Sequence, residues 1–300
     1  MIAIGVDAGG TSTVAALSRN GSFVREARGP AANATTAGID DAARAILRTI
    51  RSAADGTEAD AIYIAAAGAG RPRIAEGLQS LVQSAFARAR VLVVDDTAAA
   101  LRSAIPSGPG VVLIAGTGSV AYAENGDLRV RTGGAGYLLG DEGSAYAIGL
   151  GAVKLYTRVL DGRAARDETS DLVARTLHAP DRAALLDAMY GAQFMPAEIA
   201  ALAPVIIAFA GKGNRASTKI VQDAAKELGD LLKSAVKLAN LLDASPPVAL
   251  AGGLMRENSL LTFLLETRIN GDIAGATIVR NGDEPVRGAL RLAEGLAVHA

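Results

Sequence analysis

Hydrophobic and polar positions at the start of the chain follow the two-residue period of β-strands. Residues 2–6, 13–17 and 23–27 form three strand-like runs, and Asn20-Gly21 between the last two is typical of a tight hairpin turn. The sequence therefore predicts a three-stranded meander at the amino terminus.

After the meander, helix-like and strand-like segments alternate. Residues 39–53 and 74–87 carry apolar side chains at helical spacing, whereas residues 61–66 and 91–94 are short, continuous apolar runs. Such alternation is typical of an α/β lobe in which helices connect neighbouring strands of one sheet.

The opening pattern occurs a second time, after a loop rich in glycine and proline at residues 105–110. The segments IGVDAGGTSTVAAL and VVLIAGTGSVAYAE share a strand, a loop of glycines and hydroxyl residues, and a second strand. Two copies of one unit predict a duplicated architecture. We therefore expect an N-terminal α/β lobe over residues 1–107 and a C-terminal α/β lobe over residues 108–300.

The rest of the chain is predicted to be mostly helical over residues 142–242. A late buried strand at residues 248–254 runs into a glycine turn, and a last strand at residues 276–280 precedes a helix at residues 284–298. This final helix is a candidate to return to the N-terminal lobe.

The composition narrows the class of partner. The 300 residues include 30 basic and 31 acidic side chains. This balance gives no large field of one sign that would favour nucleic acid or a membrane surface, so we expect a small-molecule partner. The uncharged, mostly apolar stretch at residues 199–211 is shorter than the ~20 apolar residues of a membrane span, and the amino terminus lacks the basic segment of a signal peptide. A cytoplasmic protein is expected.

Several chemistries are excluded by residue type. The chain contains no cysteine, which removes disulfides, thiolate nucleophiles and thiolate metal sites. Its two histidines, His178 and His299, cannot form a Ser-His-Asp set or a histidine-rich metal site, and both are expected at the surface.

The first strand is predicted to end at Asp7, and Gly9-Gly10-Thr11 lie in the loop between it and the second strand. Consecutive amides of a bare backbone bind phosphate oxygens, and Thr11 can add a hydroxyl. Asp7 can hold a hydrated Mg²⁺ opposite the same phosphates. The residues are also typical of an ordinary glycine-rich hairpin, so this stretch alone leaves both interpretations open.

The second loop, Gly116-Thr117-Gly118-Ser119, matches the dinucleotide fingerprint G-x-G-x-x-A when the following residues are included. That fingerprint requires a helix directly after the glycines, whereas a strand is predicted here. The chain contains no Walker A sequence either. A bound nucleotide should therefore be held by the paired hairpin loops.

Two pairs of acidic residues are candidates for chemistry. Asp95 and Asp96 lie where a buried strand ends and a helix begins, and ligands bind at such strand ends. One of the two can cap the helix while the other takes a proton from an alcohol. We assign the proton transfer to Asp96 and the structural role to Asp95.

Asp141 and Glu142 follow in a glycine-rich loop near a predicted helix start. Capping of that helix is one interpretation, and hydrogen bonding to ligand hydroxyls is the other. The four acids together would also allow glycoside hydrolysis by paired carboxylates, but that reaction leaves the two glycine-hydroxyl loops unexplained.

In this order, the motifs resemble those of a known superfamily. DAGGT looks like the first phosphate loop, IAGTGS the second and LAGGL the adenosine motif of the actin, hexokinase and Hsp70 ATPases. DDTAAAL, GTGS and GDEGSA are similar to the BadF/BadG/BcrA/BcrD ATPase family, which includes N-acetylglucosamine kinases. The resemblance runs over residues 2–292. It implies a two-lobed, duplicated ribonuclease H-like α/β fold of the actin/hexokinase type, with ATP in a central cleft.

The resemblance further implies an ATP- and Mg²⁺-dependent kinase that phosphorylates the 6-hydroxyl of N-acetylglucosamine. Asp7 matches the magnesium-side acid, and Asp96 matches the catalytic base that deprotonates the sugar hydroxyl. The implied ATP-binding residues are Gly9, Gly10, Thr11, Thr117, Gly118, Gly252 and Gly253. The implied sugar-binding residues are Asn33, Asp96, Gly134, Ala135, Gly136 and Asp141.

The resemblance leaves alternatives open. Ala135 stands where several sugar-binding members have a bulky aromatic residue, so glucosamine and N-acetylmuramic acid remain alternative acceptors. A second alternative is an ATPase that acts as a conformational activator without a sugar substrate. The absence of cysteine argues against the iron–sulfur activators of this family and against the repressor-type sugar kinases. A homodimer is a further expectation, since relatives often dimerise.

Overall fold

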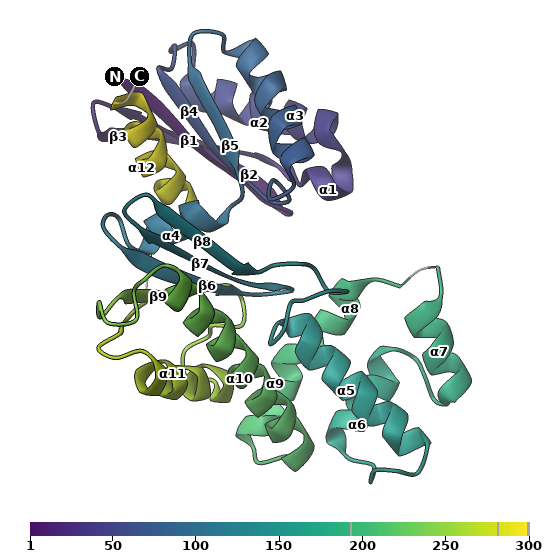
Figure 1. Cartoon of the computed structure of the whole chain (residues 1–300). Helices are drawn as coiled ribbons and strands as arrows, with labels where there is room; N and C mark the ends of the chain where they lie inside the picture. The colour runs from purple at the N-terminus through teal and green to yellow at the C-terminus, as the bar shows by residue number, and fades with distance from the viewer. Residues whose placement is uncertain (193, 281, 299–300) are drawn as a thin grey trace. The chain divides into compact units, whose positions relative to one another are not determined.

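The protein is described from a computed structural model, which covers residues 1–192, 194–280 and 282–298. The chain forms two compact units (Figure 1). One consists of Met1–Gly108 together with Val279–Ala300, and the other of Pro109–Ile278. Each unit contains a five-stranded sheet.

The sheet of the first unit has the strand order β3-β2-β1-β4-β5. Antiparallel pairing joins β1 to β2 and β2 to β3, whereas β4 is parallel to β1 and β5 is parallel to β4. Asn20 and Gly21 have φ angles of 51° and 77°, the left-handed conformations that a tight hairpin turn requires. The predicted meander is therefore confirmed. The strands are β1 (Ile2–Ala8), β2 (Ser12–Arg19), β3 (Ser22–Pro30), β4 (Ala61–Ala66) and β5 (Arg90–Val94).

Helices cover both faces of this sheet. Ile62 and Ile64 of β4 lie in the apolar cluster that includes α2 and α3, whereas Tyr63 and Ala65 lie in a second cluster with α4 and α12. This alternation follows from the opposite directions of successive strand side chains. The final helix thus packs against β1, β2, β4 and α4 of the first unit. The helices are α1 (Ala34–Ala37), α2 (Ile39–Ala54), α3 (Pro72–Ala85), α4 (Thr97–Ala104) and α12 (Pro285–Val298).

The sheet of the second unit repeats the arrangement of the first, with the strand order β10-β9-β6-β7-β8. Antiparallel pairing joins β6 to β7 and β7 to β8, and β9 is parallel to β6. An antiparallel meander beside a parallel strand therefore occurs twice, which confirms the predicted duplication. The strands are β6 (Gly110–Ala115), β7 (Ser119–Asn125), β8 (Leu128–Gly133), β9 (Pro247–Ala251) and β10 (Thr277–Val279).

The second unit is otherwise helical, as predicted for residues 142–242. The long helix α10 packs across β6, β7 and β8 and also contacts α5, α9 and α11 (Figure 1). The helices are α5 (Ala145–Leu160), α6 (Glu168–Thr176), α7 (Arg182–Tyr190), α8 (Pro196–Ala200), α9 (Ala203–Gly211), α10 (Arg215–Leu238) and α11 (Leu260–Asp272).

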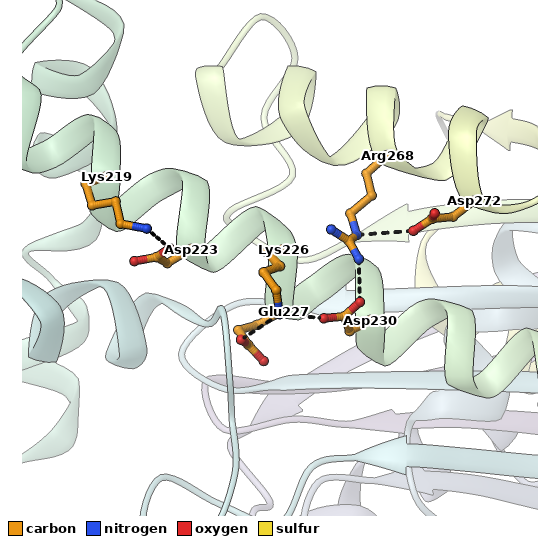
Figure 2. A network of polar contacts seen from close by, with 7 residues as sticks. All are labelled: Lys219, Asp223, Lys226, Glu227, Asp230, Arg268 and Asp272. Atoms are coloured by element: carbon orange, nitrogen blue, oxygen red, sulfur yellow. Dashed lines mark hydrogen bonds and ion pairs between the residues drawn. The ribbon is translucent and has the colours of Figure 1, made fainter.

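A network of charged side chains joins α10 to α11 (Figure 2). Arg268 of α11 forms ion pairs with Asp230 of α10 and with Asp272 one turn further along α11. Lys226 binds the other oxygen of Asp230 at 2.9 Å and, ahead of Arg268, holds the pKa of that carboxyl below its usual range. The network joins the C-terminal part of α11 to α10, the helix that covers the sheet.

Two further sequence expectations concern the surface. Among the described helices, no single one has the length and apolar composition of a membrane span. The helical segments Pro196–Gly211 and Arg215–Leu238 meet these criteria only when taken together, and they are bent by 113° relative to each other. His178 is exposed, as expected, and His299 lies outside the described residues.

Candidate functional site

Three loops of the first unit are joined at one edge of its sheet. The amide of Ala67, after β4, donates to the carbonyl of Ala8 at the end of β1 over 2.9 Å, and the amide of Ala32, after β3, donates to the carbonyl of Gly9 over 3.0 Å. The parallel strands β1, β4 and β5 all end at this edge. Ligands of α/β proteins bind at the carboxyl ends of such strands.

Asp7 and Asp96 are brought together at this edge. Burial raises the pKa of Asp7 from 3.8 to about 6, and the negative charges of Asp96 and Glu284 add to the effect. A carboxylate that is poorly solvated and surrounded by like charges is stabilised when a cation binds beside it. This electrostatic environment fits the magnesium-side role that the resemblance implies for Asp7.

The protein side chains alone would not enclose such a cation. Among the described residues, no group of three or more histidine, cysteine, aspartate or glutamate side chains could hold a metal ion. Magnesium commonly keeps several waters and takes one or two carboxylates together with substrate phosphates. Asp7 therefore fits a metal that arrives with a nucleotide rather than a permanently bound one.

The neighbouring residues Asp95 and Asp96 make different contacts. Asp95 accepts hydrogen bonds from the amide and the hydroxyl of Thr97 in the first turn of α4, with the amide at 3.1 Å. Asp96 occupies the N-cap position, but its side chain makes no capping hydrogen bond and is exposed. This division agrees with the structural role expected for Asp95 and leaves the Asp96 carboxylate at the surface of the sheet edge.

Asn33 lies beside the first glycine loop. A Cβ atom at Gly10 would be 3.9 Å from Nδ2 of Asn33. The Oδ1 atom of Asn33 accepts from the amide of Thr35 at 2.9 Å, which caps the short helix α1. The first unit thus gathers six of the predicted site residues at one sheet edge: Asp7, Gly9, Gly10, Thr11, Asn33 and Asp96.

In the second unit, Asp141 supports the second glycine loop. Its side chain is buried, with 9% of the residue exposed, and Oδ1 accepts from the amide of Ser119 at 3.2 Å. A Cβ atom at Gly118 would be 2.8 Å from the same oxygen. Burial raises the pKa of Asp141, and the Ser119 amide opposes that shift. Sequence analysis missed this supporting role; the predicted contact with sugar hydroxyls stays a prediction.

Helix α5 closes the same loop from the other side. Its first amides, on Ala145 and Tyr146, donate to the carbonyls of Gly116 and Thr117 at 2.9 and 3.3 Å. The first amides of a helix have no partner within the helix, so the loop satisfies them. The exposed Thr117 remains at the tip of the loop.

The glycine turn after β9 lies directly beside this second loop. Gly252 has a φ of 95°, and the amide of Leu254 donates to the carbonyl of Ala115 at 3.0 Å. The backbone amide of Gly253 is 4.0 Å from the position of a Cβ atom on Gly116. The predicted adenosine motif and second phosphate loop are therefore neighbours, because β9 and β6 are adjacent parallel strands.

A cavity of about 270 Å³ opens next to this turn. One wall is formed by α9, with Pro204, Ile207 and Ala208, and the opposite side by Gly253 and the residues leading into α11. A mostly apolar wall facing exposed backbone suits a flat, partly polar ring such as a nucleotide base.

The BadF/BadG/BcrA/BcrD ATPase family model matches residues 4–293. The chain belongs to this family. An N-acetyl-D-glucosamine kinase of Dictyostelium discoideum is 27% identical over 310 residues and covers 97% of both chains. An N-acetylmuramic acid/N-acetylglucosamine kinase of Clostridium acetobutylicum is 28% identical over 237 residues, 79% of this chain and 78% of the relative.

A solved structure of a protein from Chromobacterium violaceum, assigned as an N-acetylglucosamine kinase, has 27% sequence identity to the present chain. It superposes with a TM-score of 0.74 over 97% of this chain and 98% of its own. The α/β fold of the actin/hexokinase type that the resemblance implied is therefore confirmed.

The remaining predicted sugar residues of this BadF-family ATPase lie in the second unit. Gly134, Ala135 and Gly136 form the start of the loop after β8, and Asp141 follows in the same loop. The predicted sugar residues are thus divided between the two units, with Asn33 and Asp96 in the first.

Sequence analysis also missed Glu284. Its carboxylate binds Arg28 at 3.0 Å and contributes to the raised pKa of Asp7. Val14, opposite Asp7 on β2, packs in one cluster with Val286 of α12, which brings the start of this helix towards Asp7. Only the fold reveals this neighbour, because Glu284 lies near the other end of the chain.

Proposed function

We propose that the chain is an ATP-dependent kinase that transfers phosphate to an amino sugar, with the 6-hydroxyl of N-acetylglucosamine as acceptor. The observation that carries the proposal is the position of Asp7 and Asp96 beside the first glycine loop, at the carboxyl edge of the parallel strands. Membership of an ATPase family and the kinase names of the relatives support it.

In this proposal the two acids have separate roles. Asp96 accepts the proton of the attacking sugar hydroxyl, a contribution of about 10²- to 10⁴-fold in rate. Asp7 would hold the hydrated Mg²⁺ that accompanies ATP. Bound magnesium would neutralise part of the phosphate charge.

The glycine loops and the turn after β9 provide the positioning that phosphoryl transfer needs. The proposed phosphate contacts are Gly9, Gly10, Thr11, Thr117 and Gly118. Gly252 and Gly253 are the proposed contacts of the adenosine. Asn33, Gly134, Ala135, Gly136 and Asp141 are the proposed contacts of the sugar, in addition to Asp96.

Other amino sugars are the second candidates as acceptor. The relatives include kinases named for N-acetylmuramic acid and for glucosamine. Since Ala135 is smaller than the aromatic residue of several sugar-binding members, we expect it to restrict the acyl group less. An ATPase without a sugar substrate is not favoured, because all three of these curated relatives are named as sugar kinases. A cytoplasmic location and a homodimer remain predictions.

The proposal is tested by ADP release with ATP and Mg²⁺ in the presence of single sugars. N-acetylglucosamine should stimulate turnover above the rate without sugar, and product analysis should place the phosphate on the 6-hydroxyl. Glucosamine, N-acetylmuramic acid and glucose serve as comparison acceptors. If none of the four sugars stimulates ADP release, the kinase assignment is wrong.

A further inference from the structure

The hydroxyl of Thr35 lies against the Cα atom of Gly68. A Cβ atom at Gly68 would be 2.4 Å from Oγ1 of Thr35 and 3.4 Å from Oδ1 of Asn33. Gly68 also has a φ of 87°, which side chains other than glycine rarely adopt. A glycine at this position is therefore what allows the Thr35 hydroxyl to occupy its place.

The segments that carry Thr35 and Gly68 are fixed to the first glycine loop. Ala32, just before Asn33, is bonded to the carbonyl of Gly9, and Ala67, just before Gly68, is bonded to the carbonyl of Ala8. The hydroxyl of Thr35 thus lies at the same sheet edge as the proposed phosphate and sugar contacts, and its position does not depend on a long flexible loop.

Thr35 and Asn33 offer complementary hydrogen-bonding groups. The Oδ1 atom of Asn33 is already engaged by the amide of Thr35, so its Nδ2 group, beside Gly10, is left as a donor. Thr35 is exposed, and its hydroxyl has no hydrogen-bond partner among the residues that the structure describes. A hydroxyl can donate and accept, so of the Nδ2 group of Asn33 and the Thr35 hydroxyl only the latter can accept a hydrogen bond from a sugar hydroxyl.

The adjacent residue, Thr36, is oriented differently. Its Oγ1 donates to the carbonyl of Asn33 at 3.2 Å, within the same helical turn. Thr36 therefore satisfies its hydroxyl locally, whereas Thr35 presents its hydroxyl at the sheet edge. The two threonines form a matched pair for mutagenesis.

We propose that Thr35 is a specificity-determining residue whose hydroxyl hydrogen-bonds a ring hydroxyl of the acceptor sugar, other than the hydroxyl that is phosphorylated. This inference rests on the proposed kinase function. A site that forms a hydrogen bond to a substrate hydroxyl discriminates against the analogue that lacks it.

The test compares Thr35→Val, Thr35→Ser and Thr36→Val in the full chain. Loss of one neutral hydrogen bond is worth about tenfold in affinity at most, so Thr35→Val should raise KM for N-acetylglucosamine about three- to tenfold. The KM for ATP and the thermal unfolding midpoint should change little. Thr35→Ser, which keeps the hydroxyl, should have a sugar KM close to that of the wild type, and so should Thr36→Val.

Deoxy sugars identify the contact itself. The wild type should use the 3-deoxy or the 4-deoxy analogue of N-acetylglucosamine less efficiently than the parent sugar. In Thr35→Val the penalty should disappear for one of these analogues and persist for the other, whereas a purely structural defect would affect both analogues alike. Calorimetric titration of N-acetylglucosamine without ATP should show the same loss of affinity in Thr35→Val.

Failure of this inference can be distinguished from failure of the proposed function. If the wild type releases ADP in response to N-acetylglucosamine but Thr35→Val keeps the wild-type sugar KM and both deoxy penalties, the assignment of Thr35 is wrong and the kinase function stands. If the wild type responds to no sugar, the kinase function is wrong and the role of Thr35 fails with it.

Discussion

Burial and, after it, the negative charge of Asp96 raise the pKa of Asp7, although the two residues come from the ends of β5 and β1, strands separated in the sheet by β4. The parallel order brings the ends of these strands to one edge and so places two acids of different solvation side by side. Asp7 is half-buried, whereas Asp96 is exposed. This difference in environment is the basis for assigning them different roles.

The substitution Asp96→Asn should remove the general base and leave the fold intact. The side chain is exposed and makes no capping bond, so we expect the unfolding free energy to change by less than about 0.5 kcal/mol. The kcat with N-acetylglucosamine should fall about 10²- to 10⁴-fold. Steady-state kinetics and thermal unfolding of the same preparation measure both quantities.

Asp95→Ala is the matched control for that experiment. Asp95 bonds the amide of Thr97, so its loss should cost about 1 kcal/mol of stability, as for other capping side chains. Turnover should be reduced much less than in Asp96→Asn. A larger loss of kcat in Asp95→Ala than in Asp96→Asn would show that Asp95, and not Asp96, is the general base.

Asp7→Asn should stabilise the nucleotide-free protein while abolishing its activity. An acid whose pKa is raised by folding binds its proton more tightly in the folded than in the unfolded state. Its contribution to stability is complete below the unfolded pKa of 3.8 and is lost as the pH rises through about 6. Replacing the charge should therefore raise the unfolding free energy by up to about 3 kcal/mol near pH 8. Urea unfolding at about pH 4 and about pH 8 should show the gain only at the higher pH.

The affinity for magnesium nucleotide should fall below about pH 6, because protonated Asp7 no longer offers a charge to the cation. About one pH unit below the pKa, we expect the apparent magnesium affinity to be about tenfold weaker than near pH 8. Titration with Mg²⁺ at fixed ADP, followed by calorimetry, measures the effect. Asp7→Asn should bind magnesium nucleotide weakly at both pH values; a persistent pH dependence in that variant would assign the titration to another group.

Local sequence patterns were sufficient for much of the secondary structure. The strand predicted at residues 61–66 is β4, Ala61–Ala66, because a continuous apolar run between polar neighbours is a short-range signal. Helix α3 begins at Pro72 rather than at residue 74, since proline suits the first helical turn. Helix α1 has four residues, too few for any periodic pattern, and was not predicted.

The candidate site was less predictable, because its geometry depends on contacts between distant segments. The pair Asp95 and Asp96 could be divided into a capping and an exposed residue from their position before a helix. The contact of Asp141 with the amide of Ser119 depends on how the second unit folds. The proximity of Glu284 to Asp7 depends on the packing of α12 on β1. Neither could be predicted from local sequence. Charge and residue type indicated the chemistry, but not these partners.

The glycines of the turn after β9 should separate structural from ligand-binding effects. A Cβ atom at Gly252 would be 2.3 Å from the carbonyl oxygen of Ala115, and the φ of Gly252, 95°, is unfavourable for other residues. Gly252→Ala should therefore destabilise the protein by at least about 2 kcal/mol.

A Cβ atom at Gly253 meets nothing within 4 Å, yet this residue lines the cavity beside the turn. Gly253→Ala should therefore unfold like the wild type while the Kd for ADP rises about tenfold, because the added methyl group occupies space proposed for the adenosine. Chemical unfolding and calorimetric titration with ADP measure the two effects. Unchanged ADP affinity in a stable Gly253→Ala protein would show that the adenosine does not bind in this cavity.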